Sequence, residues 1–307
     1  IANVSVLIIQ GKYNPMSRLA TRFAQLESQQ RKALVSYVMA GDPHPEVTVP
    51  LLHQMVEAGV DIVELGLPFS DPMADGPVIA LAAERALAGG TNTLDALNMV
   101  KEFRQRDQET PVVLMGYLNP VEVIGYEKFV EYAHDCGVDG VLLVDLPPEE
   151  AREFDEVLNK YGMNQIFLLA PTSTPERIQF VANQASGFIY YVSLKGVTGA
   201  ATLDVAEAAA RIQQIKAVTN VPVGVGFGIS DAASAKADSS QVTTSEFVSS
   251  ETNLQESVPD DTALIPLGAG ADRPRLMETE SELIGRITSL RTQLFVDTTD
   301  AGSVALQ

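Results

Sequence analysis

The sequence of 307 residues contains one cysteine, three histidines and few basic residues. A single cysteine, Cys136, excludes an internal disulfide framework and agrees with a reducing compartment, so we expect a cytoplasmic protein. No apolar run approaches the roughly 20 residues that a membrane-spanning helix needs. The formal net charge is −19, from 21 Lys and Arg against 40 Asp and Glu. That balance argues against nucleic acid as a partner, because phosphate backbones bind basic surfaces.

The three histidines, His44, His53 and His134, do not fall at the ends of predicted strands. A serine–histidine hydrolase and a histidine-ligated metal site are therefore poor interpretations, and we expect no metal. Proton chemistry must then depend on carboxylates and tyrosines. The acidic balance does not argue against a phosphorylated small molecule, since backbone N–H groups can hold a phosphate.

The sequence does contain a recurring two-part unit, in which a short apolar run precedes a longer segment with helical periodicity. The apolar runs are Ala33–Met39, Ile62–Leu65, Pro111–Gly116, Gly140–Val144, Gln165–Ala170, Gly187–Val192 and Val221–Val225. The helical segments are Ser17–Lys32, Glu46–Glu57, Pro77–Leu87, Thr93–Arg106, Tyr126–Cys136, Pro148–Tyr161, Pro175–Gln184 and Val205–Val218. Continuously apolar runs are typical of parallel strands that helices cover on both faces.

Seven successive strand–helix units favour an α/β fold of the (β/α)8 TIM-barrel type, with a doubly wound open sheet as the alternative. The pattern stops at Ala237, so the eighth strand–helix unit is missing or replaced. We divide the chain into a leader, 1–15, which is a poor signal peptide, an incomplete barrel domain, 16–237, and a polar acidic tail, 238–307. The tail is expected to be disordered apart from one helix at 275–295. Its only short apolar run, Thr262–Leu267, is weakened as a strand by its proline.

A carboxylate, Glu64, stands at the end of the second apolar run, and a second, Asp75, follows eleven positions later on a loop rich in proline and glycine. An ionised carboxylate in apolar surroundings costs several kcal/mol unless it is paired or titrates. Such groups are typical of sites where a proton is moved. The alternatives are a buried salt-bridge partner for Glu64 and a helix N-cap for Asp75.

Active sites of such barrels lie at the carboxyl ends of the strands. The polar groups expected there are Asp42, Glu64, Asp75, Tyr117, Asn119, Asp145, Thr172 and Tyr190. Of these, we expect Asp145 to be structural. Two glycine-rich turns, Gly196–Gly199 and Gly226–Gly228, follow the sixth and seventh runs and form a candidate phosphate cradle of backbone N–H groups. For Gly226–Gly228 alone, plain turn geometry is the alternative.

The stretch Glu64–Pro77, with the sequence ELGLPFSDPMADGP, resembles the signature of the tryptophan synthase alpha chain family. The other matching stretches are Met39–Pro43, Met115–Pro120, Gly137–Pro147, Tyr190–Gly199 and Val225–Ile229. The likeness runs from about Met16 to Ala237, and the tail does not match. Other phosphate-binding barrels would share the glycine turns but not the carboxylate loop.

The resemblance implies retro-aldol cleavage of indole-3-glycerol phosphate to indole and glyceraldehyde 3-phosphate, a carbon–carbon lyase step of tryptophan biosynthesis that needs no cofactor. Glu64 and Asp75 match the family's catalytic carboxylates, Glu64 as general acid–base and Asp75 as the acceptor of the indole N–H. The implied substrate-binding residues are Tyr190, Tyr117, Met115, Thr198, Gly199, Gly226 and Gly228. The segment Lys195–Leu203 would be a lid over the substrate.

The resemblance also implies a partner, a pyridoxal-phosphate β chain, in an α2β2 assembly. The loops Phe69–Met73 and Asn119–Val123 would face that chain. The Gly-Ser pair that completes the family's phosphate site is missing beyond residue 237, which leaves two alternatives open. One is a catalytically impaired barrel that binds and activates a β chain. The other is a different phosphate-binding barrel isomerase, which the carboxylate loop disfavours.

Overall fold

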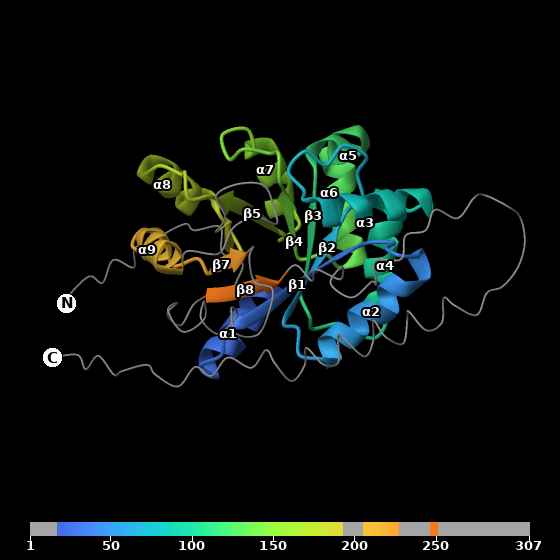
Figure 1. The fold of residues 1–307 in the computed structure, drawn as a ribbon, viewed down its shortest axis with the longest axis horizontal. Coiled ribbons are helices and arrows are strands. Elements are labelled where there is room, and N and C mark those ends of the chain that lie inside the picture. Colours follow the sequence, from blue (N-terminus) through green and yellow to red (C-terminus); the bar gives the residue numbers. More distant parts are fainter. Residues whose placement is uncertain (1–16, 193–204, 227–245, 251–307) are drawn as a thin grey trace, which may run out of the picture.

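The computed structural model describes residues 17–192, 205–226 and 246–250. Within them, eight parallel strands follow one another in chain order around a closed barrel, with helices outside it (Figure 1). The strands are β1 (Ala33–Met39), β2 (Ile62–Gly66), β3 (Val112–Gly116), β4 (Gly140–Leu143), β5 (Asn164–Leu169), β6 (Ile189–Val192), β7 (Val223–Gly226) and β8 (Glu246–Ser250). The predicted α/β barrel is confirmed, and the open sheet is excluded.

In the part of the chain that the structure describes, α1 precedes β1, and one or two helices follow each strand from β1 to β6. The helices are α1 (Arg18–Ser28), α2 (Pro45–Glu57), α3 (Pro77–Ala88), α4 (Thr93–Phe103), α5 (Leu118–Ile124), α6 (Tyr126–Cys136), α7 (Arg152–Lys160), α8 (Pro175–Gln184) and α9 (Val205–Lys216). Helix α5 was not predicted, because seven residues with Pro120 in the first turn are too short to show a helical period. In the ranges that the structure covers, no helix is long and apolar enough to cross a membrane.

Strand β8 closes the barrel by pairing with β7 on one side and with β1 on the other. Its Phe247 lies in register with Ala33 of β1 and Gly224 of β7. This corrects the sequence-based expectation, which placed residues 246–250 in a disordered tail and named Thr262–Leu267 as the only candidate strand.

The physical reason for this correction is that β1 and β7 would otherwise present unpaired N–H and C=O groups, and a main-chain ladder satisfies them whatever the side chains. The eighth strand is thus replaced by a segment of polar composition. Residues 1–15, the run at 262–267 and the possible helix at 275–295 lie outside the described residues.

Helix α1 covers the amino-terminal end of the barrel. Its Leu19, Phe23 and Leu26 pack against the side chains that fill the barrel interior. Those interior side chains are Ala33, Val35, Ile62, Val113, Leu142, Ile166, Phe188 and Tyr190. The side-chain oxygen of Ser17 accepts a hydrogen bond of 3.1 Å from the Ala20 N–H and so caps α1. With this end filled, the carboxyl ends of the strands remain as the place for a site.

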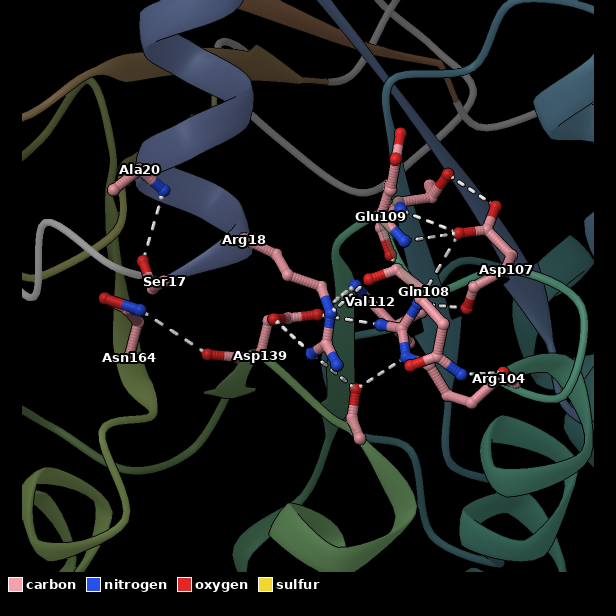
Figure 2. Close-up of polar contacts among 12 residues, drawn as sticks. Ser17, Arg18, Ala20, Arg104, Asp107, Gln108, Glu109, Val112, Asp139 and Asn164 are labelled. Carbon is pink, nitrogen blue, oxygen red and sulfur yellow. Dashed lines mark hydrogen bonds and ion pairs between the residues drawn. The ribbon is translucent and has the colours of Figure 1, made fainter.

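A buried carboxylate, Asp139, ties α1 and α4 to the start of β4 (Figure 2). It accepts hydrogen bonds of 2.9 Å from Arg18 Nη1, 2.9 Å from Arg104 Nη2 and 2.8 Å from the Val112 N–H. Arg104 is itself only 6% exposed and donates a further bond of 2.9 Å to the Gly137 carbonyl. Burial lowers the pKa of Arg104 to about 10, so its guanidinium stays charged at neutral pH.

The same arrangement recurs at the start of β2, where Asp61 accepts two bonds from Arg31 Nη2, of 3.0 and 2.7 Å, and one of 3.0 Å from the Leu34 N–H. Both carboxylates end a Gly-Val-Asp sequence, Gly59–Asp61 and Gly137–Asp139. The two glycines have φ values of +106° and +90°, a left-handed backbone that favours glycine. The motif therefore builds the corner that turns a helix into a strand and places a carboxylate beside the preceding strand.

We expect the substitution Asp139→Asn to lower the free energy of unfolding by about 3 kcal/mol, because it leaves two arginines beside a buried site without their counter-charge. Urea denaturation followed by circular dichroism measures this loss. The matched control is Glu127→Gln, which breaks the exposed ion pair with Lys160 and should leave the denaturation midpoint unchanged. Equal stability of Asp139→Asn and the original chain would contradict this account of the corner.

Candidate active site

Four of the predicted site residues lie at or beyond the carboxyl ends of β2 and β3. Glu64 lies on β2, Met115 on β3, and Tyr117 directly after β3 as the N-cap of α5. Asp75 lies on the loop between β2 and α3. Residues from two separate stretches of the sequence are thus brought to one end of the barrel, as expected for active-site groups of this fold.

Glu64 is a buried carboxylate inside the barrel, with 1% of its surface exposed. Its neighbour two positions back, Ile62, belongs to the interior cluster, so Glu64 also faces the interior. In the strand register it lies between Tyr37 of β1 and Val113 of β3. The carboxylate therefore faces the interior of the barrel rather than the layer between strands and helices.

Asp75 is linked to Tyr117 by a hydrogen bond between their side chains. The Tyr117 hydroxyl also accepts a bond of 3.0 Å from the Ala74 N–H, which fixes the loop to the end of β3. Burial raises the pKa of Asp75 to about 6, and the bond from Tyr117 lowers it in part. Burial likewise raises the pKa of Tyr117, so its hydroxyl keeps its proton at neutral pH.

The alternative role of Asp75 as a helix N-cap is excluded. The N-cap of α3 is Gly76, no side chain caps the helix, and Pro77 begins it. A proline at the first helical position has no N–H to satisfy, so this helix start needs less capping. The carboxylate of Asp75 is therefore available to the space at the end of the barrel.

A small hollow, with a cavity volume of about 10 Å³, lies at these strand ends. Its lining residues are Tyr37, Met39, Leu67, Asp75, Met115, Gly116, Tyr117 and Val144. The wall is mostly apolar and carries one carboxylate and two tyrosine side chains. Such a wall suits a flat apolar ring that has one N–H to donate. A larger hollow, of about 530 Å³, lies on the outer helix layer between α6 and α7, away from the strand ends.

Sequence reasoning missed five of the residues that line the hollow: Tyr37, Met39, Leu67, Gly116 and Val144. A signal was present for the first two, because they alternate with Val35 along β1 and so face the same side of the strand. The continuously apolar character of the run hid this alternation. Leu67 and Val144 each directly follow a strand and carry no polar group that would have marked them.

Several residues expected at the strand ends make structural contacts away from the hollow. Asp42 accepts bonds of 2.6 and 2.9 Å from Arg85 of α3. Asp145 accepts a bond of 2.7 Å from the Leu118 N–H at the start of α5, the structural role expected for it. Tyr190 is buried in the barrel interior and does not line the hollow.

The candidate phosphate cradle is described only in part. Gly226 ends β7 and lies in register with Val192 of β6 and Ser249 of β8. The whole lid segment Lys195–Leu203, with Thr198 and Gly199, lies outside the described residues. Gly228 and the rest of each glycine turn also lie outside them. Among the described residues, no group of three or more His, Cys, Asp or Glu side chains could hold a metal ion.

Comparison with known proteins connects this geometry to one family. The family model described as the tryptophan synthase alpha chain matches residues 23–255, a range that includes β8. The tryptophan synthase alpha chain of Acinetobacter baumannii (strain AYE) is 84% identical over 222 residues, which are 72% of this chain and 83% of that protein. The alpha chain of Acinetobacter baylyi is 81% identical over the same length and shares of the two chains.

Solved structures agree with this relationship. Tryptophan synthase subunit alpha from Legionella pneumophila str. Paris superposes with a TM-score of 0.75 at 38% identity, covering 91% of this chain and 98% of the other. Tryptophan synthase from M. tuberculosis, in an aminoacrylate-bound form, superposes with a TM-score of 0.72 at 30% identity, covering 91% and 98%. This chain therefore belongs to the tryptophan synthase alpha chain family.

Proposed function

We propose that this chain cleaves indole-3-glycerol phosphate to indole and glyceraldehyde 3-phosphate, with Glu64 and Asp75 as its catalytic residues. Membership of the family makes the chain a lyase that serves the alpha-subunit step of tryptophan biosynthesis. The observation that carries the assignment of residues is the buried carboxylate of Glu64 inside the barrel, close to a hollow that Asp75 lines. The alternatives of another barrel isomerase and of a non-catalytic binding partner gain no support from the comparisons.

The reaction requires a carbon–carbon bond to an aromatic ring to break. Protonation of the indole carbon at that bond by Glu64 moves positive charge onto the ring nitrogen. Asp75, as an ionised carboxylate, accepts the ring N–H and stabilises this charge. Glu64, now deprotonated, takes the proton of the glycerol hydroxyl next to the bond. The bond electrons then return to the ring, which releases indole and leaves an aldehyde on the phosphate-bearing fragment.

The phosphate would be held on the side of the barrel opposite the indole hollow. Gly226 at the end of β7, with Thr198, Gly199 and Gly228, would supply backbone N–H groups to it. Strand β8 lies beside Gly226 and ends in two serines, Ser249 and Ser250. The carboxyl end of β8 thus lies beside the proposed phosphate site, where the family's Gly-Ser pair is missing from the sequence. Met115, Tyr117 and Tyr190 complete the proposed substrate-binding set.

The family implies a β-chain partner, and the loops expected to face it carry exposed apolar side chains. Met73 is 82% exposed and Val123 is 80% exposed, the two highest values among the large apolar residues that the structure describes. Exposed apolar groups of this kind are typical of docking surfaces when they lie together. We propose that these loops bind the β chain, in an α2β2 complex in the cytoplasm.

The substitution Glu64→Gln tests the assignment of the acid–base. The glutamine keeps the shape of the side chain but cannot transfer the proton, so indole release should fall by about a hundredfold or more. Binding of glycerol phosphate, measured by calorimetry, should be unchanged. Glu131→Gln, at an exposed position on α6, is the control. Retained turnover in Glu64→Gln would refute this role for Glu64.

The pH dependence of kcat/KM tests the role of Asp75. Because Asp75 must be ionised to accept the indole N–H, and its pKa is raised to about 6, kcat/KM should fall as the pH drops through about 6. Tyr117→Phe removes a hydrogen bond that lowers the pKa of Asp75. In this variant the fall of kcat/KM on the acid side of the profile, the acid limb, should therefore move to higher pH.

The control for this pH experiment is Tyr126→Phe. The Tyr126 hydroxyl donates to Glu122 on the outer surface, so its removal should leave the acid limb in place. An acid limb that stays in place in Tyr117→Phe, or moves to lower pH, would contradict the proposed role of Asp75.

A further inference from the structure

A histidine ring is packed between two helices of the outer layer. Helices α2 and α4 contact each other on the outside of the barrel (Figure 1). His53 of α2 lies against Phe103, the last residue of α4, with ring centroids 4.8 Å apart and ring planes inclined by 34°. Phe103 has no exposed surface. His53 therefore serves as an aromatic packing residue where the two helices meet.

One nitrogen of this ring is buried without a partner. Nε2 of His53 makes no hydrogen bond to any residue that the structure describes. A neutral imidazole can leave Nε2 without a proton and carry its N–H on Nδ1. A protonated ring has an N–H at both positions and a positive charge, and a buried donor without an acceptor is costly. The packing at Phe103 thus accommodates the neutral ring and opposes the imidazolium.

The charged groups around His53 do not remove this preference. On its own helix and on the end of α4, with the loop that follows, the charged neighbours are Glu57, Glu102, Arg106 and Asp107. A further cation, the guanidinium of Arg104, lies 5.4 Å from the centroid of the Phe103 ring. Burial first and Arg106 second lower the pKa of His53 below its ordinary value of 6.5, although the three acidic neighbours act in the opposite direction.

Asp107 is already engaged with other groups. It accepts hydrogen bonds from the Glu109 N–H, the Thr110 N–H and the Thr110 hydroxyl, of 2.9, 2.8 and 2.7 Å. It also lies 3.9 Å from Arg104. Turning this carboxylate toward a charged His53 would break those bonds. The carboxylate closest in sequence to Phe103 on the loop side is thus held in place and cannot become the missing partner without a cost.

We propose that His53 is a proton-sensitive contact of the fold, at which the uptake of one proton weakens the packing of α2 on α4 and destabilises the barrel. The residue after Phe103 is Arg104, which holds the corner before β4 through Asp139. A weakened α4 terminus therefore reaches a buried ion pair. The inference concerns the fold and does not rest on the proposed catalytic role of Glu64 or Asp75.

The sign of the effect follows from proton linkage. A group whose pKa is lower in the folded chain than in the unfolded chain binds fewer protons when folded. The stability that His53 contributes is therefore fully present above its unfolded value of about 6.5 and is lost as the pH falls below it. The loss ends once the pH has passed the lower folded value.

The substitution His53→Phe keeps an aromatic ring against Phe103 and cannot take up a proton. We expect urea denaturation to show a constant difference in stability between this variant and the original chain above about pH 7. Below pH 6.5, the folded-to-unfolded ratio of the original chain should fall relative to that of His53→Phe, by at most about tenfold for each pH unit. The carboxylates titrate in both proteins, so the difference isolates His53.

The matched control is His44→Gln, at the exposed N-cap of α2, where the histidine side chain makes no capping bond. It should reproduce the pH dependence of the original chain. A difference between His53→Phe and the original chain that stays constant from pH 8 to pH 5 would overturn the inference.

A second measurement needs no variant that must remain folded at acid pH. Nuclear magnetic resonance of the original chain follows the three histidine rings as the pH is lowered, with His53→Gln used at neutral pH to assign the His53 signal. The midpoint of His53 should lie below 6.5. In Arg106→Gln it should rise, because a repelling cation is removed. Arg152→Gln, which removes an exposed cation on α7, should leave it in place. A His53 midpoint at or above 6.5 in the original chain would overturn the proposal.

Discussion

The backbone N–H and C=O groups of a parallel strand are all hydrogen-bonded only when the strand has a neighbour on each side. The candidate site of this protein depends on that constraint. β1 lies between β2 and β8, and its register with β2 places Tyr37 beside Glu64. Without β8, one edge of β1 would lose its ladder, and the strand that supports the buried carboxylate would lie at the edge of an open sheet. Closure of the barrel is therefore the condition on which the proposed chemistry rests.

Carboxylates at the two ends of the barrel have different neighbours, and these neighbours suit them to different roles. At the amino-terminal end, Asp61 and Asp139 are neutralised by arginines and accept backbone N–H groups, so they hold the corners together. At the carboxyl-terminal end, Asp75 is partly buried beside tyrosine rather than arginine, and burial raises its pKa to about 6. A group that titrates near neutrality is suited to chemistry, whereas a carboxylate held by arginines is suited to structure.

Much of this could be predicted from the sequence, because the signals were local. Apolar runs marked seven strands within two residues of their ends. The motif around Glu64 and Asp75 singled out two carboxylates, of which the first lies on β2 and the second lines the hollow. Strand β8 could not be predicted, since its sequence, Glu-Phe-Val-Ser-Ser, is not an apolar run like those of the other strands, and the unpaired edges of β1 and β7 that it satisfies are not visible in the sequence. Tyr37, which lines the hollow, was missed because the apolar run of β1 does not show which of its side chains face the barrel interior.

The central claim is that a barrel closed by a polar eighth strand still carries out the alpha-subunit reaction. The most direct test is the release of indole from indole-3-glycerol phosphate by the purified chain, measured alone and with a β chain added. The account predicts release by the chain alone and faster release in the complex. A folded chain that binds a β chain but releases no indole in either condition would contradict the account.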